Sequence, residues 1–358
     1  MYPGSLTTPL APTSESTAVK VAMDVNQKFN KRRGRHARVY AVVFVLTAAT
    51  MLKLCSSNLS FSRSSCPSST EEPPHTDATT KVLRKYGSLI ALDMEKLHPK
   101  FKILTPLTNL DMGWAHVDYF AKEKEYFEEA AAILSAREKG LLGDRCTILD
   151  IGANVGYVTL FGASIGCIVH SVEAHPKTAD FLEASILVNR FENVYLHRGA
   201  ISRTFSGSLS FTMDLHGIYN HVVRDTSTTT PTLTVPVLPR LSEIVTGEVQ
   251  LVKIDVEGCE YDALLSIMNI LRTKQVNLIM FEWVPKRMRE RGQVNDPENF
   301  TKELRNLGFK LFRTNGLALS DIELTNDQED MNLVIALRQS VQAEAFLTSY
   351  SEWATKLT

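Results

Sequence analysis

The sequence carries almost no net charge and no cysteine pattern typical of a metal site. Its 39 basic and 40 acidic residues leave a formal charge of −1, so no overall positive field attracts nucleic acid to it. The five cysteines include no CxxC pair and no zinc-ligand spacing, and their odd number excludes complete pairing within the chain. We expect Cys146, Cys167 and Cys259 to be small core or helix-start residues. The cysteines by themselves leave the redox compartment open.

Two phosphate-binding patterns are also missing. No Lys-Ser or Lys-Thr pair follows the glycines near residue 152, which argues against a P-loop. A dinucleotide-binding turn needs glycine where Asn154 and Tyr157 stand in this sequence. A dinucleotide oxidoreductase therefore stays only as an alternative, and it predicts affinity for a nicotinamide cofactor.

Long apolar runs are scarce, but one stands near the N-terminus. Residues 39–55, VYAVVFVLTAATMLKLC, follow the basic cluster KRRGRHAR at residues 31–38 and are about as long as the shortest stretches that cross a bilayer. Positive charge on one side predicts that residues 1–38 stay in the cytosol while the rest enters the lumen. The sequence thus predicts a signal anchor and a single-pass type II membrane protein of the Golgi or endoplasmic reticulum. A cleaved signal peptide is the alternative, disfavoured by the long lead before the run.

The segments around the predicted catalytic domain differ in composition. Residues 56–80 are rich in Ser, Thr and Pro and poor in large apolar side chains, which predicts a disordered stem. Residues 81–146 are predicted to form a helical lead-in, and residues 339–358 a C-terminal tail. Glycosylation triplets at Asn58 and Asn299 agree mildly with a lumenal body.

From residue 147 onward, strand-like apolar runs alternate with helix-like stretches. The runs are TILDIG, CIVHSVEA, NVYLHRGA, VQLVKIDVEG and NLIMFEWV, and the stretches include PKTADFLEASILVNR and EYDALLSIMNILRTK. This alternation predicts an α/β fold with a mostly parallel sheet. Ligands of such sheets bind beyond the carboxyl ends of the strands.

The stretch ILDIGANVGYVTLFG at residues 148–162 places an acid and glycines between a strand and a helix. Asp150 closes the strand, and Gly152 and Gly156 permit a sharp turn with close ligand approach. Glu173 ends the next strand, where a carboxylate can accept hydrogen bonds from ribose hydroxyls. With Asp255 at the end of a later strand, several carboxylates face one ligand, which suits a cation better than a polyphosphate. The predicted cofactor is S-adenosylmethionine.

Three motifs resemble those of FkbM-type S-adenosylmethionine-dependent methyltransferases. DIGANVGYVTL, VEAHP and LVKIDVEGCEYDALL stand in the family's order and at similar spacing. The resemblance implies, for residues 147–338, the class I methyltransferase fold, a seven-stranded sheet whose last strand, NLVIAL, lies antiparallel beside FKLFRT. It also implies methylation of a hydroxyl oxygen. By this resemblance, the methionine end of the cofactor is lined by Asp150, Gly152, Asn154 and Gly156, and Glu173 holds the ribose.

Methyl transfer to a hydroxyl requires an aligned oxygen and usually a base that removes its proton. Asp255 is the first candidate for this base, and Glu257, in the turn that follows, is the second. Glu260 is expected only to favour a helix N-terminus through the helix dipole. These three acids raise the possibility of a magnesium or calcium site, but no matching ligand is evident elsewhere, so no metal is predicted.

An insert separates the third and fourth strands of the domain. Its runs SLSFTMD and TLTVPVL alternate like strands, and we expect the insert to overhang the site. His216 and His221 in its middle are candidate bases near neutral pH, with an exposed polar loop as the alternative. Further along, Trp283 is a candidate for stacking on a sugar, although a packed Trp is the more frequent case. PKRMRERGQ is predicted to be a solvated helical end, with contact of Lys286, Arg287 and Arg289 to an acidic acceptor as the alternative.

Taken together, the residues and the resemblance predict an O-methyltransferase that uses S-adenosylmethionine. Its expected acceptor is a hydroxyl of a small molecule or a glycan, with no nucleic-acid partner. A membrane-tethered module that binds cofactor without catalysis is one alternative. A cytosolic small-molecule methyltransferase is another, if the N-terminal run is not an anchor.

Overall fold

The computed structural model describes residues 44–46, 89–94, 99–106, 124–212, 232–273, 275–320, 323–324 and 330–357. The predicted tail at residues 1–38, the predicted stem at 56–80 and most of the predicted anchor at 39–55 lie outside these ranges. Within the described ranges, no helix has the length and apolar character that a membrane span requires. The anchor and the type II orientation stay predictions.

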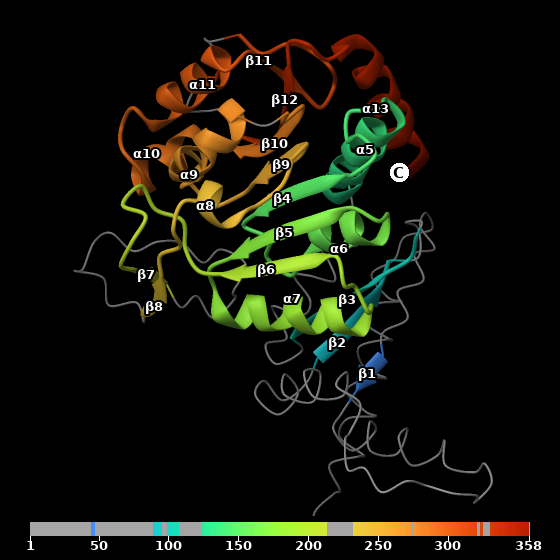
Figure 1. The fold of residues 1–358 in the computed structure, drawn as a ribbon, viewed down its shortest axis with the longest axis vertical. Helices are drawn as coiled ribbons and strands as arrows, with labels where there is room; N and C mark the ends of the chain where they lie inside the picture. The colour runs from blue at the N-terminus through green and yellow to red at the C-terminus, as the bar shows by residue number, and fades with distance from the viewer. Residues whose placement is uncertain are drawn as a thin grey trace, which may run out of the picture.

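A seven-stranded sheet forms the centre of the molecule, with the strand order β11-β12-β10-β9-β4-β5-β6 (Figure 1). Its strands are β4 (Thr147–Ile151), β5 (Ile168–Glu173), β6 (Val194–Arg198), β9 (Leu251–Ile254), β10 (Leu278–Trp283), β11 (Phe309–Arg313) and β12 (Met331–Arg338). The strands from β10 to β6 pair in parallel, whereas β12 runs antiparallel to both β10 and β11. The predicted class I methyltransferase fold, with its antiparallel last strand, is confirmed.

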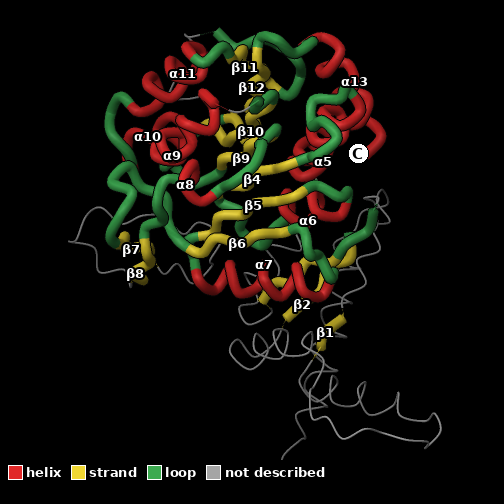
Figure 2. Tube along the Cα trace, in the orientation of Figure 1, coloured by secondary structure: helices red, strands yellow, loops and turns green. Residues whose placement is uncertain are grey.

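Helices cover both faces of the sheet (Figure 2). One face packs against α5 (Lys124–Glu138), α6 (Tyr157–Ser164), α7 (Pro176–Val188) and α13 (Ala343–Leu357), and the other against α8 (Leu241–Ile244), α9 (Glu260–Thr273), α10 (Pro285–Arg291) and α11 (Asp296–Asn306). Neighbouring residues of one strand therefore enter different cores: Ile148 and Leu149 are both fully buried, on opposite faces. Burial on both faces explains why these strands appear in the sequence as continuous apolar runs.

A small antiparallel sheet lies beside α7. It consists of β1 (Phe44–Leu46), β2 (Leu89–Asp93) and β3 (Lys102–Pro106). The Leu104 backbone N–H donates to the hydroxyl of Ser185 on α7 at 2.8 Å, which joins this sheet to the main body. The lead-in at 81–146 thus contains strands as well as a helix, and β1 falls within the predicted anchor.

The insert contains the two strands that its alternation predicts. β7 (Ser208–Thr212) and β8 (Thr232–Pro236) pair in antiparallel fashion. In Figure 1 they lie on the side toward which the arrows of β4, β5 and β6 point, which is the carboxyl end of the parallel strands. His216 and His221 belong to residues 213–231, which lie outside the described residues. Their position over the site stays a prediction.

Cys146 and Cys167 form a disulfide, with Cα atoms 4.6 Å apart. The expectation that both are unpaired core residues was wrong. Each cysteine directly precedes one of two adjacent parallel strands, β4 and β5, and the Ile168 N–H donates to the Cys146 carbonyl at 2.8 Å. Strand pairing therefore brings together two cysteines that are 21 residues apart in the sequence. Cys259 is buried and is not part of a disulfide.

Candidate active site

The turn after β4 presses its backbone against the end of β9. Gly152 and Gly156 have positive φ angles, of 84° and 94°, where glycine is favoured. A Cβ atom on Gly152 would lie 1.7 Å from the carbonyl oxygen of Asp255, so a side chain there does not fit. Asn154 also has a positive φ, of 51°. The turn thus packs its backbone directly on the carboxyl end of β9, at the edge of the sheet where ligands of such folds bind.

Glu173, at the end of β5, holds this turn through its backbone. One carboxylate oxygen accepts a hydrogen bond from the Asn154 N–H at 2.8 Å, and the other accepts one from the His175 N–H at 2.7 Å. Burial nevertheless raises the pKa of Glu173 to about 7. A carboxylate has about four acceptor positions, so two protein donors leave capacity for ligand hydroxyls. This arrangement is compatible with the predicted contact to a ribose.

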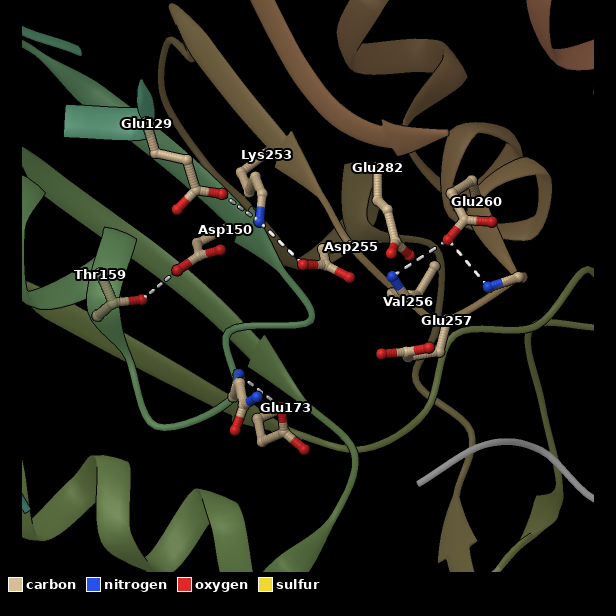
Figure 3. Close-up of polar contacts among 12 residues, drawn as sticks. Glu129, Asp150, Thr159, Glu173, Lys253, Asp255, Val256, Glu257, Glu260 and Glu282 are labelled. Atoms are coloured by element: carbon tan, nitrogen blue, oxygen red, sulfur yellow. Dashed lines mark hydrogen bonds and ion pairs between the residues drawn. The ribbon is translucent and has the colours of Figure 1, made fainter. Parts of the chain in front are cut away.

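Asp150 and Lys253 lie side by side, because they are register partners on the adjacent strands β4 and β9. Asp150 is buried, and its carboxylate accepts a 2.6 Å hydrogen bond from the Thr159 hydroxyl; burial raises its pKa. The Nζ atom of Lys253 lies 2.7 Å from the carboxylate of Glu129 on α5 and 3.2 Å from that of Asp255 (Figure 3). A buried ammonium and three carboxylates therefore gather beside the glycine turn.

A second acidic group lies at the ends of β9 and β10. Carboxylate oxygens of Asp255, Glu257 and Glu282 lie within 4.8 Å of one another, and among the described residues this is the group suited to hold a metal ion. However, Arg287 of α10 donates to both Glu257 and Glu282, so positive charge is already supplied there. Burial, with the negative charges of Asp255 and Glu257, raises the pKa of Glu282 to about 9.

Asp255 is the most accessible carboxylate of this group. Its side chain is 37% exposed, compared with 21% for Glu257 and 17% for Glu282. Glu257 has a positive φ, of 55°, and its carboxylate pairs with Arg287 and Arg291. Such strain in a residue other than glycine is typical of functional turns. The expectation that PKRMRERGQ is a solvated helical end was wrong for these two arginines, because they pair with Glu257.

Glu260 and Trp283 have structural roles: Glu260 lies at the start of a helix, and Trp283 packs in the core. Glu260 is buried at the start of α9, where its carboxylate accepts a hydrogen bond from the Gly258 N–H at 3.0 Å. Burial raises its pKa to about 7. Trp283 is fully buried and packs edge-on against Phe281, so it cannot stack on a sugar.

Sequence reasoning missed Lys253 and Glu129. The signal for Lys253 was a single cation in the apolar run LVKIDV, two positions before Asp255 and so on the same side of the strand. Glu129 had no such signal, because it stands among several acids in KEKEYFEEA. Only the packing of α5 on the sheet selects Glu129 from that group.

The sequence of the domain that forms this crevice matches a known protein family. Residues 150–311 match the family model of the methyltransferase FkbM domain. This part of the chain is therefore similar to the methyltransferase FkbM family. The resemblance seen in the three motifs is thereby confirmed, and the match begins at Asp150. Helix α5 and Glu129 precede the matched span of the FkbM domain. No curated protein sequence matches this chain.

Solved methyltransferase structures align with this chain at low similarity. An O-methyltransferase from Bacillus cereus in complex with SAH is 15% identical, with a TM-score of 0.36, over 61% of this chain and 80% of that one. Methyltransferase FkbM from Methylobacillus flagellatus is 13% identical, with a TM-score of 0.35, over 53% of this chain and 43% of that one. At this level of similarity, the roles of individual residues rest on this chain's own contacts.

Proposed function

We propose that this chain transfers a methyl group from S-adenosylmethionine to a hydroxyl oxygen of its acceptor. One observation carries the proposal: the glycine turn at Gly152 lies against the carboxyl end of β9, beside two buried carboxylates, Asp150 and Glu173, and the partly exposed carboxylate of Asp255. This combination favours a cationic ligand that bears a ribose, because negative charge in a low-dielectric crevice stabilises a nearby cation. The match of residues 150–311 to the methyltransferase FkbM domain supports the same conclusion.

S-adenosylmethionine carries a methyl group that is activated by a positively charged sulfonium. Its methionine end would lie over Gly152, Asn154 and Gly156, in the turn whose backbone packs against that of Asp255. Its ribose would bind Glu173, whose carboxylate already faces the same turn through the Asn154 N–H. The residues present therefore fit this cofactor.

The acceptor hydroxyl must lose a proton as its oxygen bonds to the methyl carbon and the carbon–sulfur bond breaks. Asp255 is the best base, because it is the most exposed carboxylate at the carboxyl end of β9. Glu282 is less suitable, because its side chain is only 17% exposed and already accepts a hydrogen bond from Arg287. Glu257 is less available than Asp255, because its carboxylate is held by Arg287 and Arg291.

We also propose that the acceptor is a hydroxyl of a glycan or another polar small molecule, and that transfer occurs in the secretory lumen. The anchor-like run at 39–55 and the basic cluster before it support this topology. The Cys146–Cys167 disulfide supports it independently, because such bonds persist in oxidising compartments. The glycosylation triplet at Asn299 does not support a lumenal location, because Asn299 is half-buried within α11 rather than in a surface loop.

Calorimetry of the purified chain with S-adenosylmethionine tests the cofactor. We expect saturable binding of S-adenosylmethionine and none of a nicotinamide dinucleotide. Incubation with a labelled methyl donor and a hydroxyl-bearing glycan extract should then label an acceptor. Binding without turnover on any hydroxyl acceptor would favour a tethered binding module, and absent binding would contradict the proposal.

Protease protection of a C-terminally tagged protein in sealed vesicles tests the topology. We expect the tag to be protected until the membrane is permeabilised. Digestion of the tag in intact vesicles would instead place the domain in the cytosol.

A further inference from the structure

A buried cation lies where the proposed function needs negative charge. Lys253 is almost fully buried on β9, and its ammonium lies 3.2 Å from the carboxylate of Asp255. Burial of an unpaired ammonium is costly, and this one would also repel a sulfonium bound at the adjacent turn. The structure therefore requires a partner that offsets the charge of Lys253.

Glu129 is that partner, and it lies outside the FkbM domain match. Its carboxylate is 2.7 Å from the Nζ atom of Lys253, and its side chain is largely buried. It comes from α5, which packs on the same face of the sheet as α6 and α13. Figure 3 shows Lys253 between Glu129 on one side and Asp255 on the other, with Asp150 nearby.

The charges of this group can be counted. Glu129, Asp150 and Asp255 contribute three negative charges when ionised, and Lys253 contributes one positive charge, which leaves a net charge of −2. Without the carboxylate of Glu129 the net charge would be −1. Tyr350 of α13 also lies near Glu129, but its buried phenol is uncharged at neutral pH because its pKa is raised.

We propose that Glu129 neutralises Lys253 so that Asp150 and Asp255 present their full negative charge to the sulfonium of the donor. This inference rests on the proposed function and adds to it a basis for distinguishing donor from product. Methyl transfer turns the sulfonium of S-adenosylmethionine into the neutral thioether of S-adenosylhomocysteine. Excess negative charge at the site therefore favours the donor over the product and promotes product release. Glu129 is a specificity-determining residue in this scheme.

The test compares the dissociation constants of the two compounds, each measured by calorimetry with the full chain at pH 8.5. This pH is chosen because burial raises the pKa of Glu129 to about 7, so the carboxylate is ionised there. In Glu129→Gln we expect the preference for S-adenosylmethionine over S-adenosylhomocysteine to fall roughly tenfold, as one charge acting across a partly buried site implies. Glu128→Gln removes the same charge from the same helix and should leave the preference within about twofold of wild type.

A double variant separates charge from packing. Glu129→Gln/Lys253→Gln removes one charge of each sign and restores the net charge of −2, so the preference should return to within about threefold of wild type. Lys253→Gln alone should leave the preference at or above the wild-type value. These two variants decide the question even if Glu129→Gln alone does not fold.

An unchanged preference in Glu129→Gln, or an equal loss of affinity for both compounds, would overturn the inference and leave the proposed function intact. A fall in preference in Lys253→Gln would also overturn it. Failure of the wild-type chain to bind either compound would instead contradict the proposed function itself.

Discussion

The two ends of the parallel strands use polar groups in opposite ways. At the amino end, Arg338 donates hydrogen bonds to the carbonyls of Leu271, Val276 and Leu307, and the disulfide joins the starts of β4 and β5. At the carboxyl end, the buried carboxylates of Glu129 and Asp150, both with raised pKa values, lie beside the buried ammonium of Lys253, and Glu173, also with a raised pKa, holds the glycine turn. Positive φ angles occur there in Asn154 and Glu257.

This difference shows where the molecule is stabilised and where it binds. Polar groups at the amino end are satisfied by backbone partners, so they add to stability without a ligand. Buried acids and strained residues at the carboxyl end destabilise the free protein, which is typical of a site whose energy is recovered on binding. The two ends should therefore respond differently to matched substitutions.

The largest contrast is expected between two glycines. Gly152→Ala at the carboxyl end would place its Cβ 1.7 Å from the carbonyl oxygen of Asp255. We expect destabilisation of about 3 kcal/mol or more and loss of measurable S-adenosylmethionine binding. Gly166→Ala at the amino end has a similar φ, of 90°, but no atom within 4 Å of its Cβ. It should cost only about 1 kcal/mol and bind normally. Thermal unfolding and calorimetry measure both, and equal effects would contradict the contrast.

Removal of the disulfide should weaken the amino end alone. For Cys146→Ser/Cys167→Ser we expect a loss of about 3 kcal/mol of unfolding free energy, given a closed loop of about 20 residues. The dissociation constant for S-adenosylmethionine at 25 °C should stay within about twofold of wild type, because the bridge lies at the far end of the strands. Chemical denaturation and calorimetry check the two quantities. A parallel loss of affinity would show that the ends are not independent.

A carboxylate substitution should affect the site more than the fold. Asp255→Asn removes the proposed base, so we expect the transfer rate at saturating donor to fall about 100-fold. Donor affinity should fall by a smaller factor, about tenfold, because one negative charge is lost. Asp144→Asn, an exposed residue before β4, is the matched control and should leave both values unchanged. A wild-type rate in Asp255→Asn would exclude Asp255 as the base.

The smallest effect is expected at Glu173 and should depend on pH. Because its pKa is about 7 in the folded chain and 4.5 ordinarily, the folded state binds more protons between these values. Stability of the free protein therefore falls as pH rises through this window, and Glu173→Ala should reduce that slope. The same variant should bind S-adenosylmethionine about tenfold more weakly at pH 8. Unfolding curves from pH 4.5 to 8, with the exposed Glu183→Ala as control, measure the slope; identical slopes would contradict the assignment.

Much of the fold could be predicted, because the burial of a segment requires a recognisable pattern of apolar residues in its own sequence. Strands covered on both faces appear as apolar runs, and the turn glycines stand where the chain must adopt positive φ angles. The strands of the insert were predicted from alternation alone. Patterns of this kind depend on neighbours in the sequence, so one chain suffices to detect them.

The candidate site could be predicted only in part. Asp150, Gly152, Glu173 and Asp255 stand at strand ends, and parallel strands bring such residues to one edge. Lys253 and Glu129 were missed, as was the pairing of Cys146 with Cys167, because these contacts join distant segments. The pattern of apolar and polar residues within a segment does not indicate which distant segment packs against it.

By itself, the sequence determined that this chain builds a mostly parallel sheet with a glycine turn and acids at its carboxyl end. Local conformational preference and the burial of apolar side chains are sufficient for that. Only the tertiary structure decided the electrostatics, namely which carboxylate neutralises Lys253 and which acid stays exposed. Charge interactions depend on distance and burial in space, and neither quantity can be read from the order of residues.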